Sequence, residues 1–222
     1  MSTSGSDRCA VSPRTDPLTT WTAWIGQLAA RPTTATIAAL ALILNCPGIA
    51  EPARGWLVLS RDALAAGAWW TVFTGPLLHL SGPHLLFDVA GLLFVGWMFE
   101  PLLRGWYVGI AVWITLVVSA TFFVAYPQMS SYYGLSSLDQ GLFCAGLAAL
   151  WRRGDRISAG MLLAALAVKW IAELSGGESV LAWLPFDENA FGTAVPWTHI
   201  AGGLAGLIAG YLAAGRRGAV ES

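Results

Sequence analysis

The chain has 222 residues, of which 56% are hydrophobic and 11% are charged, and its mean hydropathy is +0.61. A soluble domain carries about 25% charged residues, so this composition excludes a disordered chain, a nucleic-acid-binding protein and a simple soluble enzyme. It indicates a membrane protein with several spans. The net charge of -1 provides no large field to recruit a polyanion, and the three separated cysteines are interpreted as free thiols.

Residues 1–32 are predicted to form a cytoplasmic tail. Residues 1–17 are rich in Ser, Thr, Pro and Asp, and no basic segment is followed at once by an apolar one, so we expect no cleaved signal peptide. Trp21, Trp24, Ile25 and Leu28 then recur at helical spacing. This pattern fits either a short helix in the membrane interface or a lead-in to the first span.

Six apolar segments follow, each near the length that a bilayer requires. We place them at residues 33–50, 84–103, 106–126, 133–151, 157–174 and 197–214. The stretch 51–83 contains Trp56, Trp69 and Trp70 and is too broken to span. It is predicted to be a structured loop in the interface, where tryptophan is enriched. We therefore expect an all-α integral membrane protein with six helices.

The arginines predict the topology. Nine of them fall on one side of a six-span arrangement: Arg8, Arg14, Arg31, Arg104, Arg152, Arg153, Arg156, Arg216 and Arg217. The positive-inside rule then predicts that both termini are cytoplasmic. We expect a membrane domain at residues 33–214 and a short cytoplasmic tail at 215–222. The expected location is the inner membrane of a bacterium. Glu100 and Arg104, spaced i,i+4 at the cytoplasmic end of the second span, are interpreted as a structural ion pair.

Ionisable groups inside a membrane are costly and are candidates for function. All three histidines, His79, His84 and His199, lie at or beside the outer ends of the second and sixth spans. Spans two, four and six all begin on the outer side, so Ser136, at the start of span four, is expected at a similar depth. A serine beside an imidazole is the minimum for nucleophilic acyl chemistry, because the imidazole takes the hydroxyl proton.

The local sequences favour this chemistry. The Gly-Leu-Ser-Ser tetrapeptide at 134–137 places Ser136 near a helix N-terminus, where unpaired N–H groups can hold a developing oxyanion. Gly202, Gly206 and Gly210 follow His199 and form a small-residue face that allows close helix packing. The tetrapeptide alone is a weak signal, but together with His199 it predicts a reactive Ser–His pair.

These residues resemble the motifs of the rhomboid intramembrane serine proteases, and the resemblance extends over residues 56–214. The family's G-x-S-G-x-x-x-G motif runs here from Gly134 to Gly141, with Ser137 in place of its second glycine. The H-x-x-G-x-x-x-G motif of the last helix is intact from His199 to Gly206.

Two further motifs of that family are present with one change each. A histidine, four residues and then H-x-x-x-N appear here as His79, His84 and, in place of the asparagine, Asp88. The Trp-Arg pair of the first loop appears as Trp70-Thr71. The tryptophan therefore matches and the arginine does not.

The resemblance implies that Ser136 is the nucleophile and His199 the general base of a two-residue dyad. It implies an oxyanion hole made of the Ser136 N–H, the His84 side chain and Asp88, and supporting positions at His79, Gly134, Gln140 and Gly202. Only a protonated Asp88 could donate to the oxyanion, and in that case Asn at this position keeps or raises activity. Gln140 stands where relatives carry an aromatic residue or a histidine that stacks on the catalytic imidazole.

Within the family the chain looks most like the rhombosortases. The signals are the Gly-Pro-Leu-Leu-His-Leu segment at 75–80, the Gly-Leu-Ser start of span four and the pair of Lys169 and Glu173, which we interpret as a structural ion pair. The resemblance implies a membrane-anchored protein substrate, cut near the outer face in a C-terminal sorting tail. Such a tail has a Gly-Gly-like motif, an apolar span and a basic end. The expected partners are this substrate and the lipid bilayer, with no nucleic acid, cofactor or metal.

Three alternatives remain open. The changes at Ser137, Asp88 and Gln140 are compatible with an inactive relative that binds membrane clients. His84-x-x-x-Asp88 is a legitimate spacing for two metal ligands on a helix. Lys169, Asp88 and Asp139 within spans are compatible with a transporter, which the lack of an inverted repeat disfavours.

Overall fold

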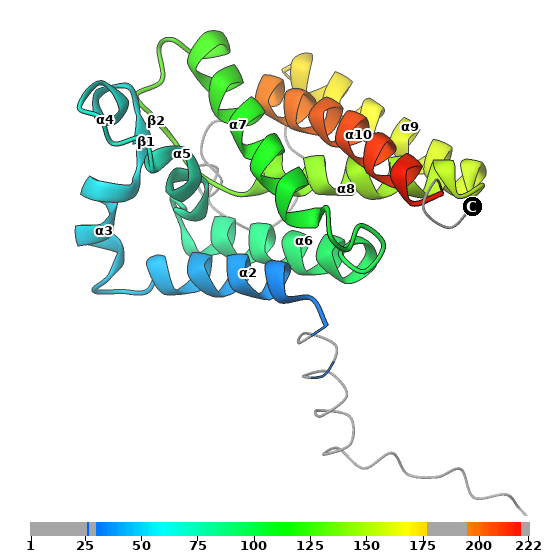
Figure 1. The fold of residues 1–222 in the computed structure, drawn as a ribbon. Helices are drawn as coiled ribbons and strands as arrows, with labels where there is room; N and C mark the ends of the chain where they lie inside the picture. Colours follow the sequence, from blue (N-terminus) through cyan, green and yellow to red (C-terminus); the bar gives the residue numbers. More distant parts are fainter. Residues whose placement is uncertain (1–25, 27–29, 177–194, 219–222) are drawn as a thin grey trace, which may run out of the picture.

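The computed structural model describes residue 26 and residues 30–176 and 195–218 (Figure 1). Its helices are α2 (Pro32–Leu44), α3 (Ala50–Leu57), α4 (Arg61–Ala65), α5 (Thr71–Thr74), α6 (Gly82–Phe99), α7 (Tyr107–Ala125), α8 (Ser136–Arg152), α9 (Arg156–Leu174) and α10 (Pro196–Gly218). A 3-10 turn covers Gly75–Leu77, and β1 (Leu59–Ser60) pairs with β2 (Ser131–Tyr132). The predicted interfacial helix on Trp21, Trp24, Ile25 and Leu28 lies outside the described residues.

Each of the six predicted apolar segments contains a helix, but not all of these helices have the length of a span. Among the described residues, α6, α7, α9 and α10 are long and apolar enough to cross a membrane. Helix α2 has 13 residues and ends at Leu44, before the predicted boundary at 50, and α8 has 17 residues. The prediction of a multi-span helical protein is confirmed for four spans.

Helix α8 lies at the centre of the bundle, against α6, α7, α9 and α10 (Figure 1). Its residues are mostly buried, so it meets protein rather than lipid, and this is why its sequence can be less apolar than that of a lipid-facing helix. The closest packing is with α10. A Cβ atom on Gly206 would overlap the carbonyl oxygen of Gly141, so these two backbones are in direct contact.

The predicted ion pair between Glu100 and Arg104 is wrong. No such pair occurs in the part of the chain that the structure describes. Instead the Glu100 carboxylate accepts the backbone N–H groups of Thr33 and Thr34, at 2.8 and 2.9 Å. The first N–H groups of a helix have no partner within it and carry partial positive charge, so the carboxylate is stabilised more by the start of α2 than by an exposed arginine. Glu100, which follows α6, is 5% exposed.

The stretch 51–83 is structured, as predicted, and contains α3, β1, α4, α5 and the 3-10 turn. Trp56 and Trp69 are the most exposed of its tryptophans. The sheet ties this stretch to the segment before α8, because Leu59 pairs with Tyr132 across the two strands. This pairing therefore fixes the backbone at Tyr132, which is four residues before Ser136.

Candidate active site

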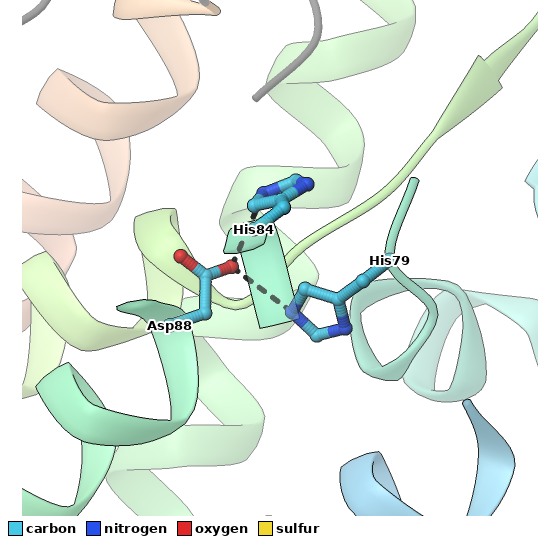
Figure 2. A group of neighbouring side chains, drawn as sticks. All are labelled: His79, His84 and Asp88. Atoms are coloured by element: carbon cyan, nitrogen blue, oxygen red, sulfur yellow. Dashed lines mark hydrogen bonds and ion pairs between the residues drawn. The ribbon is translucent and has the colours of Figure 1, made fainter. Parts of the chain in front are cut away.

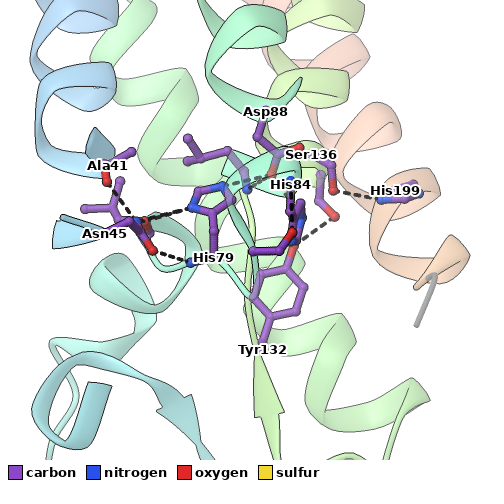
Figure 3. A network of polar contacts seen from close by, with 12 residues as sticks. Ala41, Asn45, His79, His84, Asp88, Tyr132, Ser136 and His199 are labelled. Atoms are coloured by element: carbon purple, nitrogen blue, oxygen red, sulfur yellow. Dashed lines mark hydrogen bonds and ion pairs between the residues drawn. The ribbon is translucent and has the colours of Figure 1, made fainter. Parts of the chain in front are cut away.

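The side chains of Ser136 and His199 meet although they come from different helices. Ser136 is the first residue of α8, and His199 lies in the first turn of α10. The Oγ atom of Ser136 is 3.0 Å from Nε2 of His199, within hydrogen-bond range (Figure 3). His199 is 7% exposed. This arrangement allows the hydroxyl proton to pass to the imidazole.

The backbone at the start of α8 presents N–H groups beside this pair. The first hydrogen bond of the helix runs from the Asp139 N–H to the Leu135 carbonyl, at 2.9 Å, so the N–H groups of residues 136–138 precede it. The Ser136 N–H meets no acceptor among the described residues. Such N–H groups lie at the positive end of the helix dipole and can stabilise an anion.

Asp88 connects α6 to the backbone that leads into Ser136. Its Oδ2 atom accepts the Leu135 N–H at 2.6 Å and lies 3.1 Å from Nε2 of His79 and 3.4 Å from Nε2 of His84 (Figure 2). All three side chains are buried. The structure therefore gathers His79, His84 and Asp88 at one point, directly beside the start of α8.

The same three side chains have the composition of a metal site. One ligand atom from each of His79, His84 and Asp88 lies within 4.8 Å of the others, and His and Asp are common ligands. The carboxylate oxygen that faces both rings, however, already accepts the Leu135 N–H at 2.6 Å. The donor set therefore fits a hydrogen-bonded network better than a cation.

His79 is held by a residue that the sequence analysis missed. Asn45 follows the last residue of α2, and its Oδ1 accepts the His79 N–H at 2.8 Å while its Nδ2 donates to the carbonyl groups of Ala41 and Leu77, at 2.7 and 2.8 Å (Figure 3). An asparagine directly after the last apolar residue of a helix is a C-cap signal. Nothing in the sequence, however, pairs it with a histidine 34 residues away.

Two of the predicted supporting glycines allow close approaches at the site. Gly134 has a φ of 96°, and a Cβ atom there would lie 2.6 Å from Nε2 of His84. A Cβ atom on Gly202 would lie 2.5 Å from the Ser137 carbonyl oxygen. Any side chain at either position would push apart elements that carry the site.

A buried chain of hydroxyl groups runs beside the Ser–His pair. Tyr132 donates to Ser137 Oγ at 2.9 Å, Ser137 donates to Thr198 Oγ1 at 2.9 Å, and Thr198 donates to the Val195 carbonyl at 2.8 Å. Burial raises the pKa of the Tyr132 phenol, so this group stays a donor at neutral pH. Since Ser137 and Thr198 adjoin Ser136 and His199 in sequence, α8 and α10 are joined by two neighbouring hydrogen bonds.

Replacing Ser137 by Gly restores the family motif, but we expect it to destabilise this protein. The Tyr132 hydroxyl would lose its buried acceptor, which costs roughly 1–3 kcal/mol, and a helical glycine adds up to about 1 kcal/mol. Ser158→Gly, at an exposed position in the first turn of α9, is the control for the glycine effect alone. The measurement is denaturant unfolding in mild detergent. Equal losses in both variants would contradict a role for the hydroxyl chain.

Gln140 contacts α9. Its Oε1 atom accepts the indole N–H of Trp170 at 2.7 Å and lies 3.4 Å from Nζ of Lys169. The amide therefore fastens the last turns of α9 to α8, close to Ser136.

Glu173 is the second residue whose position the sequence analysis missed. Its predicted pair with Lys169 is confirmed, but its other oxygen, Oε2, lies 3.0 Å from Nδ1 of His199. The signal was available, because α9 ends on the side where α10 begins, which brings Glu173 to the depth of His199. Two of the three residues that favoured a transporter, Lys169 and Asp88, therefore have partners at the site.

The comparisons with known proteins agree with the motifs. A family model of the Rhomboid domain matches residues 66–216, which includes every predicted site residue. No curated protein matches the sequence. The matched region covers more than half of the chain, from the loop before α5 to the last turn of α10. The protein is therefore a multi-pass membrane protein that belongs to the rhomboid family, a family of intramembrane serine proteases.

Proposed function

We propose that this protein is an intramembrane serine endopeptidase in which Ser136 is the nucleophile and His199 the general base. The distance of 3.0 Å between Ser136 Oγ and His199 Nε2 carries this proposal. A half-buried serine in contact with an imidazole can attack a carbonyl carbon, since the base removes the hydroxyl proton as the new bond forms. A positioned base of this kind raises a rate by roughly 10²- to 10⁴-fold.

In this mechanism the Ser136 oxygen adds to the scissile carbonyl and its proton passes to His199. The carbonyl oxygen becomes an oxyanion, stabilised by the Ser136 N–H and the His84 side chain. The imidazolium then returns its proton to the amine as the C–N bond breaks. Water attacks the acyl-enzyme by the same route and regenerates the serine.

Asp88 completes the oxyanion site in this proposal. Its Oδ2 is occupied by the Leu135 N–H, which leaves Oδ1 for the substrate, and only a protonated Oδ1 donates a hydrogen bond. We expect Asp88→Asn to keep or raise the rate, because the amide retains an acceptor for Leu135 and gains a donor. Asp88→Ala removes the acceptor and should lower the rate about 10²-fold. Labelling rates of both folded variants decide this, and an inactive Asn variant would show that the negative charge is required.

The proposed substrate is a membrane-anchored protein cut near the outer face. Arg152, Arg153 and Arg156 lie together where α8 ends and α9 begins, and by the positive-inside rule they support cytoplasmic termini. The proposal places six spans in a bacterial inner membrane. In that orientation the starts of α6, α8 and α10 face outward. The rhombosortase-like motifs favour a C-terminal sorting tail as the cleaved segment.

The experiment that tests this function is labelling of the full chain with a fluorophosphonate probe in mild detergent, followed by mapping of the adduct by mass spectrometry. We expect one adduct, on Ser136, whose formation a chelator does not affect. A folded protein that is not labelled would favour the client-binding pseudoprotease. Chelator-sensitive activity without an adduct would favour a metal site at His79, His84 and Asp88.

A further inference from the structure

The second ring nitrogen of His199 is also engaged. Its Nε2 atom faces Ser136 Oγ at 3.0 Å, and its Nδ1 atom faces Oε2 of Glu173, also at 3.0 Å. The side chains of His199 and Glu173 are 9% and 10% exposed. A carboxylate, an imidazole and a serine hydroxyl thus lie in series, and water has little access to the carboxylate and the imidazole.

We propose that Glu173 is a positioning residue for His199, so that Ser136, His199 and Glu173 form a hydrogen-bonded triad instead of a two-residue dyad. This inference rests on the proposed function, because it assigns a partner to the same base. It changes what the site requires, since a third helix, α9, then supplies part of the machinery.

A carboxylate at Nδ1 has two consequences for the imidazole. It accepts a hydrogen bond, so the proton of the neutral ring stays on Nδ1 and the lone pair of Nε2 points at Ser136. When Nε2 takes the serine proton, the ring becomes an imidazolium next to a fixed negative charge, and this attraction is strong where water is excluded. Glu173 remains ionised throughout and transfers no proton.

The position of Glu173 follows from the way α9 packs. Its less exposed positions, among them Ala159, Leu163, Trp170 and Glu173, recur every three or four residues and form one stripe, which is the stripe that faces neighbouring helices. Trp170 packs on Gly203 of α10, where a Cβ atom would overlap the indole. One turn after Trp170, the same stripe carries the carboxylate to His199.

Lys169 and Gln140 hold this carboxylate in place. Oε1 of Glu173 pairs with Lys169, which leaves Oε2 for His199. Gln140 on α8 accepts the Trp170 N–H at 2.7 Å and lies 3.4 Å from Lys169 Nζ. Gln140 stands where relatives have a ring that stacks on the imidazole. In this chain it orients His199 indirectly, by fastening the helix that carries Glu173.

A purely structural role for the Lys169–Glu173 pair would need only one oxygen of the carboxylate. The geometry instead divides the two oxygens between Lys169 and His199. The lysine is 37% exposed in its side chain while Glu173 is 10% exposed, so the lysine reaches outward and the acid faces inward. The contact with Lys169 therefore balances the charge of the carboxylate, and the contact with His199 orients the imidazole.

The test compares Glu173→Gln with Glu100→Gln in the full chain. Both glutamates are shielded and hydrogen-bonded, but the carboxylate of Glu100 accepts its hydrogen bonds from Thr33 and Thr34 at the start of α2. We expect Glu173→Gln to slow fluorophosphonate labelling of Ser136 by about 10²- to 10⁴-fold, and Glu173→Asp to recover part of the rate. Glu100→Gln should lower the melting temperature and leave the labelling rate of the folded protein within about twofold.

A second readout reports on His199 directly. The ¹⁵N spectrum of the imidazoles, assigned with His199→Ala, is expected to show a proton fixed on Nδ1 in the wild type and in Glu100→Gln, and a mixture of tautomers in Glu173→Gln. A wild-type labelling rate with an unchanged tautomer in Glu173→Gln would overturn the triad. If the wild type itself is not labelled, the proposed function fails. The spectrum then still decides whether Glu173 positions the ring.

Discussion

Ser136→Ala and His199→Ala are each expected to abolish measurable cleavage. Without the Ser136 hydroxyl no acyl-enzyme or phosphonate adduct forms. Without His199 the hydroxyl, held at 3.0 Å from Nε2 in the wild type, has no group to take its proton, and its reaction with the probe should slow by at least 10²- to 10⁴-fold, roughly the contribution of a positioned base. The measurements are probe labelling and cleavage of a reporter protein. The reporter carries a C-terminal tail with a Gly-Gly-like motif, an apolar span and a basic end.

Ser175→Ala is the control for the serine substitution. Ser175 follows α9, is exposed, and donates only to the Ile171 carbonyl among the described residues, so this variant should label and cleave at the wild-type rate. A Ser136→Ala protein that still cleaves the reporter would contradict the assignment of the nucleophile. An unimpaired His199→Ala protein would contradict the assignment of the base.

Gly206→Ala should cause the largest loss of stability among single methyl additions in this bundle. The added Cβ would overlap the carbonyl oxygen of Gly141, which is rigid helix backbone, so α8 and α10 must separate. Overpacking of this kind costs about 1–3 kcal/mol, and sometimes more. Because Ser136 and His199 lie on these same two helices, we expect the labelling rate to fall together with the melting temperature.

The matched control is Gly109→Ala on α7. Gly109 is exposed and nothing lies within 4 Å of its added Cβ, so the substitution should be neutral or slightly stabilising, as alanine is the better helix former. Thermal unfolding in detergent and probe labelling compare the two variants. Similar behaviour would mean that the contact between α8 and α10 does not limit the site.

The sequence predicted the position of most helices because apolar length is a property of one segment. It also predicted that Ser136 and His199 share a depth, because alternating topology fixes which ends meet. It gave the wrong end for the first span, since Ile49 continues the apolar run although Asn45 closes α2. Hydropathy records the burial of side chains and does not report where a cap satisfies the backbone.

Partners across helices were harder to predict than depth. The spacing of Glu100 and Arg104 indicates an ion pair only if both stay on one regular helix, yet α6 ends at Phe99. The sequence correctly predicted that Glu173 pairs with Lys169 on the same helix. A carboxylate has two oxygens, however, and the second oxygen of Glu173 contacts His199, which is far away in sequence. Such choices depend on rotation of one helix against another, which no single segment encodes.

The carboxylate of Glu100 has a consequence for biosynthesis. It satisfies the first N–H groups of α2 but leaves the ribosome some 66 residues after them. Until α6 has been made, the 13 residues of α2 form a helix of about 20 Å, shorter than the apolar core of a bilayer, with unsatisfied polar groups at its start. We therefore expect the start of α2 to stay without its carboxylate partner until α6 has been made, so that α2 becomes a stable part of the bundle only after α6 is present.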